Sequence, residues 1–335
     1  MKTFAFDVAG DVDDAVALLA ADPEAKLLGG GTNLVDLMKL GVERPTALID
    51  VTRLPLREVD VRDDGTVRVG AGVPNSDLAV HPVIRARYSV LSRAVLSGAS
   101  GQLRNMATTG GNLFQRTRCV YFMDSSKPCN KREPGSGCPA IEGEHRNLAI
   151  LGASEDCIAT HPSDMGVALA VLDATVEVLG PEGPKTVTFG DLHRLPGDDP
   201  TRDTTLQHHD MVTSIDLPPL PDGAVSVYRK VRDRESYAFA VVSVGAVLVM
   251  DGDTVKEVRL ALGGVAHKPW RATTAERAIT GGPATEDAFR IGIRAELAAA
   301  QPLRDNEFKV RLAENLVVNT LVDLVARARN QGVGA

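Results

Sequence analysis

Residues 27–34 read LLGGGTNL, and residues 104–113 read RNMATTGGNL. Each stretch places consecutive glycines beside threonine and asparagine. Glycine allows the backbone to approach a ligand closely, and successive N–H groups in such a turn form a concave site for phosphate oxygens. One loop of this kind is equally typical of a tight turn between a strand and a helix. The pair favours phosphate binding, because a dinucleotide carries a pyrophosphate that two loops can hold from opposite sides.

Neither loop has a standard nucleotide-binding signature. The chain has no G-x-G-x-x-G motif followed, about twenty positions later, by an acidic residue in a strand-helix-strand setting. It also has no glycine-rich loop ending in Gly-Lys-Ser or Gly-Lys-Thr. The sequence therefore argues against both a Rossmann domain and a P-loop domain.

The composition is that of an acidic globular protein. The chain has 335 residues, enough for two or three domains, with 44% hydrophobic residues and a net charge of -7. This charge argues against nucleic acid or an anionic membrane as the main partner. Acidic residues interrupt the N-terminal segment and no run of about eighteen apolar residues occurs, so we expect no signal peptide and no membrane insertion. The expected location is cytoplasmic, with export inside a complex that has a signal-bearing partner as the alternative.

The expected elements change in character along the chain. The first two thirds mix helices and strands, with a helix at 11–20, a strand, glycine turn and helix at 26–41, strands at 46–52 and 66–73, a helix at 75–97 and a helix followed by a strand at 165–180. Proline and glycine punctuate 181–223, which is typical of a boundary region. The remainder predicts a small sheet covered by helices, with strands at 225–232, 239–250 and 255–265, a hairpin turn at 251–253, and helices at 284–300 and 307–328.

All four cysteines, Cys119, Cys129, Cys138 and Cys157, lie in one loop-like segment rich in proline, glycine and charge. Disulfides are disfavoured without a secretory signal, and closely spaced cysteine pairs typical of zinc sites are absent. Four thiolates from a flexible loop suit an iron–sulfur cluster, although their spacing alone leaves zinc open. Basic residues in the same segment would offset the charge of the thiolates or, alternatively, form a solvated loop face; they are Arg116, Arg118, Lys127, Lys131 and Arg132.

The chain resembles the FAD-binding subunits of the xanthine dehydrogenase and aldehyde oxidoreductase family, the molybdenum hydroxylases. The resemblance is nearly full length and rests on LLGGGTNLVDLMK, IDVT, RNMATTGGNL, the PSD tripeptide at 162–164, SIDLP at 214–218, YRKVRDRESYAFAVVSVG at 228–245 and ALGGVAHKPWRA at 261–272. It implies an α+β fold in which a two-subdomain FAD-binding domain, like that of the PCMH and vanillyl-alcohol-oxidase proteins, precedes a C-terminal small sheet covered by helices. The implied domains are 1–222, with subdomains at about 1–55 and about 56–222 and an iron–sulfur loop at about 115–160, and 223–335.

The resemblance also implies the residues that hold FAD. In this family the two glycine loops bind the pyrophosphate, which assigns it to Leu27, Leu28, Gly29, Gly30, Gly31, Thr32, Asn33, Leu34, Thr108, Thr109, Gly110, Gly111 and Asn112. Asp164 inherits a contact with the ribityl chain, Lys230 a place near the isoalloxazine ring, and Ile215 a further flavin contact. Without the family, Asp164 would be interpreted as a helix N-cap and Lys230 as a surface lysine.

The long segment between Asn112 and Pro162 departs from most relatives. It resembles the iron–sulfur subclass found in periplasmic-type aldehyde oxidoreductases and in a benzoyl-coenzyme A reductase type. This resemblance implies that Cys119, Cys129, Cys138 and Cys157 bind a 4Fe-4S cluster.

The implied function is electron transfer. A molybdenum-cofactor large subunit would oxidise the substrate, a 2Fe-2S small subunit would relay the electrons, and FAD on this chain would pass them to an external acceptor; the three subunits would form a heterotrimer-type complex that can dimerise. No catalytic acid, base or nucleophile is expected here, and His193, His208 and His209 are interpreted as solvated loop residues. Two alternatives stay open: a flavin oxidoreductase that acts alone, and a metal-binding scaffold without enzymatic activity.

Overall fold

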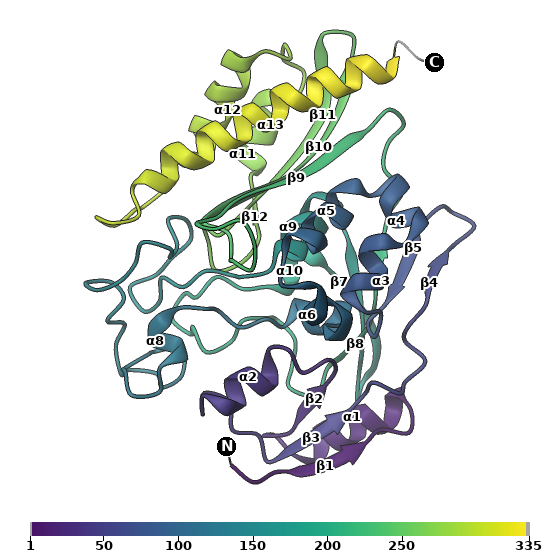
Figure 1. Cartoon of the computed structure of the whole chain (residues 1–335), viewed down its shortest axis with the longest axis vertical. Helices are drawn as coiled ribbons and strands as arrows, with labels where there is room; N and C mark the ends of the chain where they lie inside the picture. The colour runs from purple at the N-terminus through teal and green to yellow at the C-terminus, as the bar shows by residue number, and fades with distance from the viewer. Residues whose placement is uncertain (1, 333–335) are drawn as a thin grey trace.

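The structure is a computed structural model that describes residues 2–332. Its three β-sheets follow one another along the long axis of the molecule, from the N-terminal sheet at one end to the C-terminal sheet at the other (Figure 1). Helices and strands are mixed as expected for an α+β fold, and this prediction is confirmed. Within the described residues, no helix has the length and apolar character needed to cross a bilayer.

The N-terminal sheet is parallel and has the strand order β1-β3-β2. Its elements are β1 (Ala5–Val8), α1 (Val12–Ala21), β2 (Lys26–Leu28), α2 (Leu34–Lys39) and β3 (Ala47–Asp50). The carboxylate of Asp11 caps α1 by accepting a hydrogen bond from the N–H of Asp14 at 2.8 Å. The helix expected at 11–20 and the strand-turn-helix expected at 26–41 are confirmed, so the first glycine loop joins β2 to α2.

The middle sheet is antiparallel, with the order β4-β5-β8-β6-β7. Its strands are β4 (Val59–Val61), β5 (Val67–Gly70), β6 (Thr175–Gly180), β7 (Gly183–Thr188) and β8 (Met211–Leu217). The helices of this part are α3 (Asn75–Val80), α4 (Pro82–Arg87), α5 (Ser89–Ser97), α6 (Gly101–Met106), α7 (Thr109–Leu113), α8 (Val120–Met123), α9 (Asp164–Val171) and α10 (Phe189–Leu192). Buried residues of α3, α5 and α9 share one core with this sheet.

The single helix expected over 75–97 is wrong, because the chain forms three short helices there. At His81 the backbone leaves the helical region, with ψ at 128°, and Pro82 then starts α4. At Tyr88 the backbone is again non-helical, and its buried hydroxyl donates a hydrogen bond to the carbonyl of Pro218 at 3.0 Å. The helical spacing of apolar residues is present, but Pro82 and the non-helical backbone at Tyr88 divide it.

The interpretation of 181–223 as a boundary region is also wrong for most of its length. The segment contains β7, α10 and β8, and β8 lies in the centre of the middle sheet between β5 and β6. Its prolines and glycines occupy the turns, and Gly183 at the start of β7 has a φ of 105° that glycine adopts readily.

The C-terminal sheet is antiparallel and is covered by three helices. Its elements are β9 (Val225–Val231), β10 (Val242–Asp251), β11 (Thr254–Gly263), β12 (Trp270–Arg271), α11 (Thr273–Ile279), α12 (Glu286–Leu297) and α13 (Phe308–Gly332). β10 and β11 form the expected hairpin, with Gly252 in the turn at a φ of 56°. α13 lies across this sheet in Figure 1 and shares a core with it, so the prediction of a small sheet covered by helices is confirmed.

A buried lysine ties α13 to the loop that carries the cysteines. The ammonium group of Lys309 is fully buried and donates hydrogen bonds to the carbonyls of Leu148 at 2.7 Å and Gly264 at 2.5 Å. Burial lowers the pKa of Lys309 to about 7. Because a neutral amine has two hydrogens, it can still donate to both carbonyls.

We expect Lys309→Met to lower the free energy of unfolding, and by more at high pH. The substitution leaves two carbonyls without a donor, at a cost of about 1–3 kcal/mol. The folded chain favours the neutral amine above about pH 7, whereas the unfolded chain keeps the lysine pKa of about 10.4. Between these values the unfolded state binds more protons, so the contribution of Lys309 rises with pH.

Urea unfolding of both chains at about pH 6.5 and about pH 9 measures this difference. Lys256→Met is the matched control, because Lys256 is exposed on β11. The prediction would be contradicted if Lys309→Met lowered the free energy of unfolding by less at about pH 9 than at about pH 6.5.

Candidate functional site

The two glycine loops contact each other directly. A Cβ atom built on Gly30 would lie 1.7 Å from the carbonyl oxygen of Met106, and one built on Gly29 would lie 2.9 Å from Oγ1 of Thr108. No side chain fits at Gly30 without moving the backbone of the second loop. The structure therefore brings together the two stretches that the sequence singled out.

The second loop is fixed to the middle sheet by its backbone. The N–H groups of Thr109 and Gly110 donate hydrogen bonds to the carbonyls of Val73 and Ala71, each at 2.8 Å. A Cβ on Gly110 would lie 2.8 Å from the Cβ of Ala71, so glycine is needed for this close approach. The sheet thus holds the loop in a defined position.

Two asparagines extend this junction. Asn112 accepts a hydrogen bond through Oδ1 from the hydroxyl of Ser163 at 2.5 Å, which connects the second loop to the PSD tripeptide. Asn33 accepts one through Oδ1 from the N–H of Arg116 at 3.1 Å, which connects the first loop to the cysteine segment. The Nδ2 atom of Asn33 is buried without a hydrogen-bond partner among the described residues, and this is the kind of donor that a bound ligand satisfies.

Asp164 and Lys230 form a buried ion pair. Nζ of Lys230 lies 2.7 Å from Oδ2 of Asp164 and donates a second hydrogen bond to the carbonyl of Ser97 at 3.1 Å. The hydroxyl of Tyr228 donates to Oδ1 of the same carboxylate. Burial raises the pKa of Asp164, and Lys230 and Tyr228 oppose that shift. Ser163 is the N-cap of α9 and Lys230 is almost fully buried, so neither Asp164 nor Lys230 has the structural role expected without the family.

Asp164 lines a cavity of about 220 Å³ at the junction of the cysteine segment with the C-terminal sheet. Its wall includes the charged residues Arg118, Asp164 and Asp233 and the polar residues His161 and Ser243, and Phe239 contributes an aromatic ring. Nε2 of His161 is buried without a hydrogen-bond partner in the described part of the chain. The cavity combines apolar surface with a few polar groups, as small-molecule sites do.

Ile215 lies apart from this cavity. It sits on β8 opposite Val69 and Val176, with a side chain that is 1% exposed in the core under the middle sheet. Its side chain is not part of the cavity wall. Leu27, Leu28 and Leu34 flank the first loop at the end of β2 and the start of α2.

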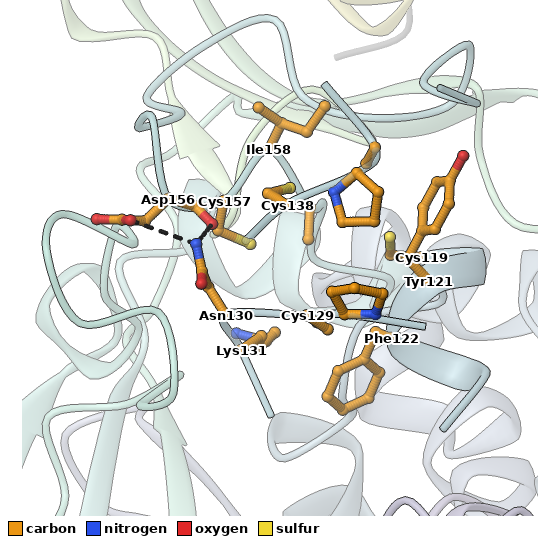
Figure 2. A pocket seen from close by; sticks show the side chains of 14 residues that line it. Cys119, Tyr121, Phe122, Cys129, Asn130, Lys131, Cys138, Asp156, Cys157 and Ile158 are labelled. Atoms are coloured by element: carbon orange, nitrogen blue, oxygen red, sulfur yellow. Dashed lines mark hydrogen bonds between the residues drawn. The ribbon is translucent and has the colours of Figure 1, made fainter. Parts of the chain in front are cut away.

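The four cysteines surround one small cavity, although they come from separate stretches of loop (Figure 2). Cys119 precedes α8, and Cys129, Cys138 and Cys157 follow in segments without regular secondary structure. Cys119, Cys129 and Cys157 are buried and Cys138 is partly exposed, and none forms a disulfide. Among residues 2–332, no group of three or more potential ligands is arranged around the position of a single metal ion.

Burial favours the protonated thiol at three of the four cysteines as long as nothing is bound to them. It raises the pKa of Cys119 and Cys138, and it raises the pKa of Cys157 to about 12. Backbone N–H groups oppose the shift at each of these sulfurs, with those of Phe122 and Tyr121 at Cys119 as an example. N–H donors directed at sulfur stabilise the thiolate form that metals require.

The basic residues near the cysteines are not a uniform solvated face. Lys131 has a side chain that is 0% exposed and pairs with Asp203 at 2.5 Å. Arg116 pairs with Asp203 and Glu43, each at 2.6 Å, and Arg132 donates to the carbonyl of Phe122 at 2.7 Å. The interpretation as a solvated face fits Lys127, which is exposed, but is wrong for Lys131.

The interpretation of His193 as a solvated residue is also wrong. His193 is buried and its Nε2 lies 2.9 Å from the carbonyl of Leu113, while its ring contacts that of His161 at 4.5 Å between centroids. Burial lowers the pKa of His193 to about 4. His208 is exposed, as expected. Among residues 2–332, no carboxylate is hydrogen-bonded to His161 or His193.

Comparison with known proteins decides the family. The family described as the FAD binding domain in molybdopterin dehydrogenase matches residues 2–220, and the CO dehydrogenase flavoprotein C-terminal domain matches residues 226–324. The chain belongs to this family. It is therefore an FAD-binding oxidoreductase subunit of the molybdenum hydroxylase type, as the sequence resemblance implied.

Relatives match this subunit over nearly its whole length. The aldehyde oxidoreductase FAD-binding subunit PaoB of Escherichia coli is 50% identical over 99% of this chain and 100% of that protein. The putative xanthine dehydrogenase FAD-binding subunit XdhB of Escherichia coli is 26% identical over 96% and 95%. A structure of carbon monoxide dehydrogenase from Hydrogenophaga pseudoflava superposes with a TM-score of 0.74 at 27% identity, covering 94% of this chain and 95% of that one.

Several residues around the two cavities escaped the sequence analysis. Tyr228 lies two positions before Lys230 on β9, so the alternation of a strand places both side chains on one face and could have revealed it. Arg118 and His161 line the larger cavity from either end of the cysteine segment, and no local pattern indicates this. The sequence offered one indication of their location: Arg118 is next to Cys119, and His161 lies three positions before Asp164.

We expect Gly30→Ala to disrupt the contact between the glycine loops. The added methyl group would overlap the carbonyl of Met106, and backbone there cannot move without breaking the hydrogen bonds of the second loop. The free energy of unfolding should fall by about 3 kcal/mol, as measured by urea denaturation. Gly101→Ala is the control, because nothing lies within 4 Å of its Cβ position. Equal stability of both variants would contradict the contact.

Proposed function

We propose that this subunit carries electrons between iron–sulfur centres and an external acceptor through FAD. The observation that supports this most directly is the contact of the two glycine loops, the second of which is hydrogen-bonded through Asn112 to Ser163 in the wall of the cavity that Asp164 also lines. When bound, FAD would supply the exchange between one-electron and two-electron transfer. The protein would bind and orient it and would set its potential. We further propose that 1–222 and 223–335 are the two domains.

The residues present fit such a cofactor. In this proposal the N–H groups of Gly29 to Asn33 hold the pyrophosphate. Residues Thr108 to Asn112 form the opposite side of the site, with the backbone N–H groups of Thr109 and Gly110 anchoring that loop to Val73 and Ala71. The unpartnered Nδ2 of Asn33 supplies a further donor. Asp164 accepts a hydrogen bond from the ribityl chain, while Lys230 holds its carboxylate in place and keeps a positive charge near the ring. Because the side chain of Ile215 is buried in the core, Ile215 could contact FAD only through its backbone.

We propose that the four cysteines bind a 4Fe-4S cluster. The donor set supports this, since four thiols surround one cavity and ligation by four cysteines is typical of such clusters. A single ion would need the sulfurs drawn around one point at about 2.3 Å from zinc, and they are not so arranged. Backbone N–H groups directed at the sulfurs would stabilise the bound thiolates.

The partners proposed for this chain are a large subunit with a molybdenum cofactor and a small subunit with 2Fe-2S clusters. The 50% identical relative is named as the FAD-binding subunit of an aldehyde oxidoreductase, which implies further subunits in that enzyme. In this proposal the large subunit oxidises the substrate, and this chain receives the electrons. The final acceptor would meet the flavin on this subunit.

Metal and flavin analysis of the complex, purified with its partners, tests this function. We expect FAD and about four non-haem irons per chain beyond those of the small subunit. Bound FAD with zinc and no additional iron would overturn the cluster and leave the flavin site intact. A chain without FAD would overturn the electron-transfer role altogether, in favour of a scaffold. Turnover of a substrate by the isolated chain would instead support a flavin oxidoreductase that acts alone.

We expect Cys138→Ser to remove most of this additional iron while leaving the FAD content close to that of the unchanged chain. Cys138 lines the cysteine cavity and is not in the wall of the larger one, so its loss should affect one site. The 4Fe-4S signal in electron paramagnetic resonance and the FAD released on denaturation give the two readings. Ser125→Ala, an exposed position in the same segment, is the control. Unchanged iron in the Cys138 variant would exclude this cysteine as a ligand.

A further inference from the structure

A buried lysine lines the cysteine cavity. Lys131 follows Cys129 by two positions, lines the same cavity and has a fully buried side chain (Figure 2). None of the assignments made so far uses it. A lysine is rarely buried without a specific partner, because removal of its charge from water is costly.

The surroundings of Lys131 offer a partner to each hydrogen of its ammonium group. Its three ammonium hydrogens have three acceptors: the carbonyl of Pro200 at 2.8 Å, Oδ1 of Asp203 at 2.5 Å and Nε2 of His267 at 2.8 Å. Nδ1 of His267 lies 3.2 Å from the carbonyl of Ala159, which can only accept. The ring proton is therefore assigned to Nδ1, and Nε2 is free to accept from Lys131.

The negative charge of Asp203 is shared between two cations. Its Oδ2 lies 2.6 Å from Nε of Arg116, while its Oδ1 binds Lys131. Arg116 is in turn paired with Glu43 on its other side. Lys131 thus lines the cysteine cavity, and its compensating carboxylate is shared with Arg116.

We infer that Lys131 raises the reduction potential of the metal cluster held by the four cysteines, and that Asp203 moderates this effect. The inference rests on the cluster proposed above. Reduction adds one electron from an external reductant to the cluster, breaks no bond and increases its negative charge by one. A positive charge beside a buried site stabilises the reduced state more than the oxidised one.

Lys131 could instead serve only to pin the cysteine segment to the loop at Pro200 and Asp203. The two roles differ in what they predict for charge-changing substitutions. Lys131→Met removes the ammonium, and Asp203 keeps Arg116 as a partner, so no isolated carboxylate is left. Asp203→Asn keeps the shape of the side chain and removes only the negative charge.

Redox titration of the purified complex, monitored by the electron paramagnetic resonance signal of the reduced 4Fe-4S cluster, tests the inference. Dithionite is the reductant. We expect the midpoint potential to fall in Lys131→Met and to rise in Asp203→Asn. Lys127→Met is the control: it also removes a lysine charge from this segment, but Lys127 is exposed, and solvent should screen the change.

Opposite shifts in the two variants, with iron content unchanged, would support the inference, since loss of a loop contact alone does not produce shifts of opposite sign. Unshifted potentials, or shifts in the same direction, would overturn it and leave the cluster proposal standing. If the Lys131→Met variant loses its iron, the Asp203→Asn variant alone tests the inference. A midpoint potential that does not rise in Asp203→Asn would then overturn it. A wild-type complex without iron at these cysteines would overturn both the cluster and this role of Lys131.

Discussion

The close approach of the two glycine loops is the constraint on which the rest of the structure depends. Gly30 lies against the carbonyl of Met106 so closely that no Cβ fits between them. This contact fixes the N-terminal parallel sheet against the middle sheet, because one loop leaves β2 and the other is hydrogen-bonded to Ala71 and Val73. It also positions two asparagines: Asn33 connects the first loop to the cysteine segment, and Asn112 connects the second loop to the PSD tripeptide.

The cysteine segment has little secondary structure, and hydrogen bonds from side chains hold its conformation in place of a sheet or helix. Asn130 donates a hydrogen bond to the carbonyl of Asp156 at 3.1 Å and accepts one from the N–H of Gly137 at 2.7 Å. Arg132 binds the carbonyl of Phe122, and Lys309 binds that of Leu148. Buried donors thus satisfy carbonyls that would otherwise lack partners, so four thiols from distant positions can share one cavity.

Local chemistry made much of this predictable, and contacts distant in sequence explain most of what was missed. The glycine loops and the hairpin at Gly252 follow from backbone freedom. The family resemblance assigned Asp164 and Lys230 to different parts of the flavin, and their ion pair was not predicted. Pro82 could have predicted a break in the helix, but the regular apolar spacing on both sides of it favoured a single helix. The burial of Lys131 could not be predicted, because its partners Asp203 and His267 lie far along the chain.

The pairing of β5 with β8 has a consequence for how the protein is made. Arg68 and Asp216 face each other across these central strands, yet they are 148 residues apart in sequence, and the whole cysteine segment lies between them. During synthesis the ribosome releases all four cysteines before β8 exists to complete the sheet. Newly made chains therefore pass through a stage in which all four cysteines exist while the middle sheet is still incomplete. For the cluster proposed at these cysteines, this interval is when assembly machinery would meet the least folded chain.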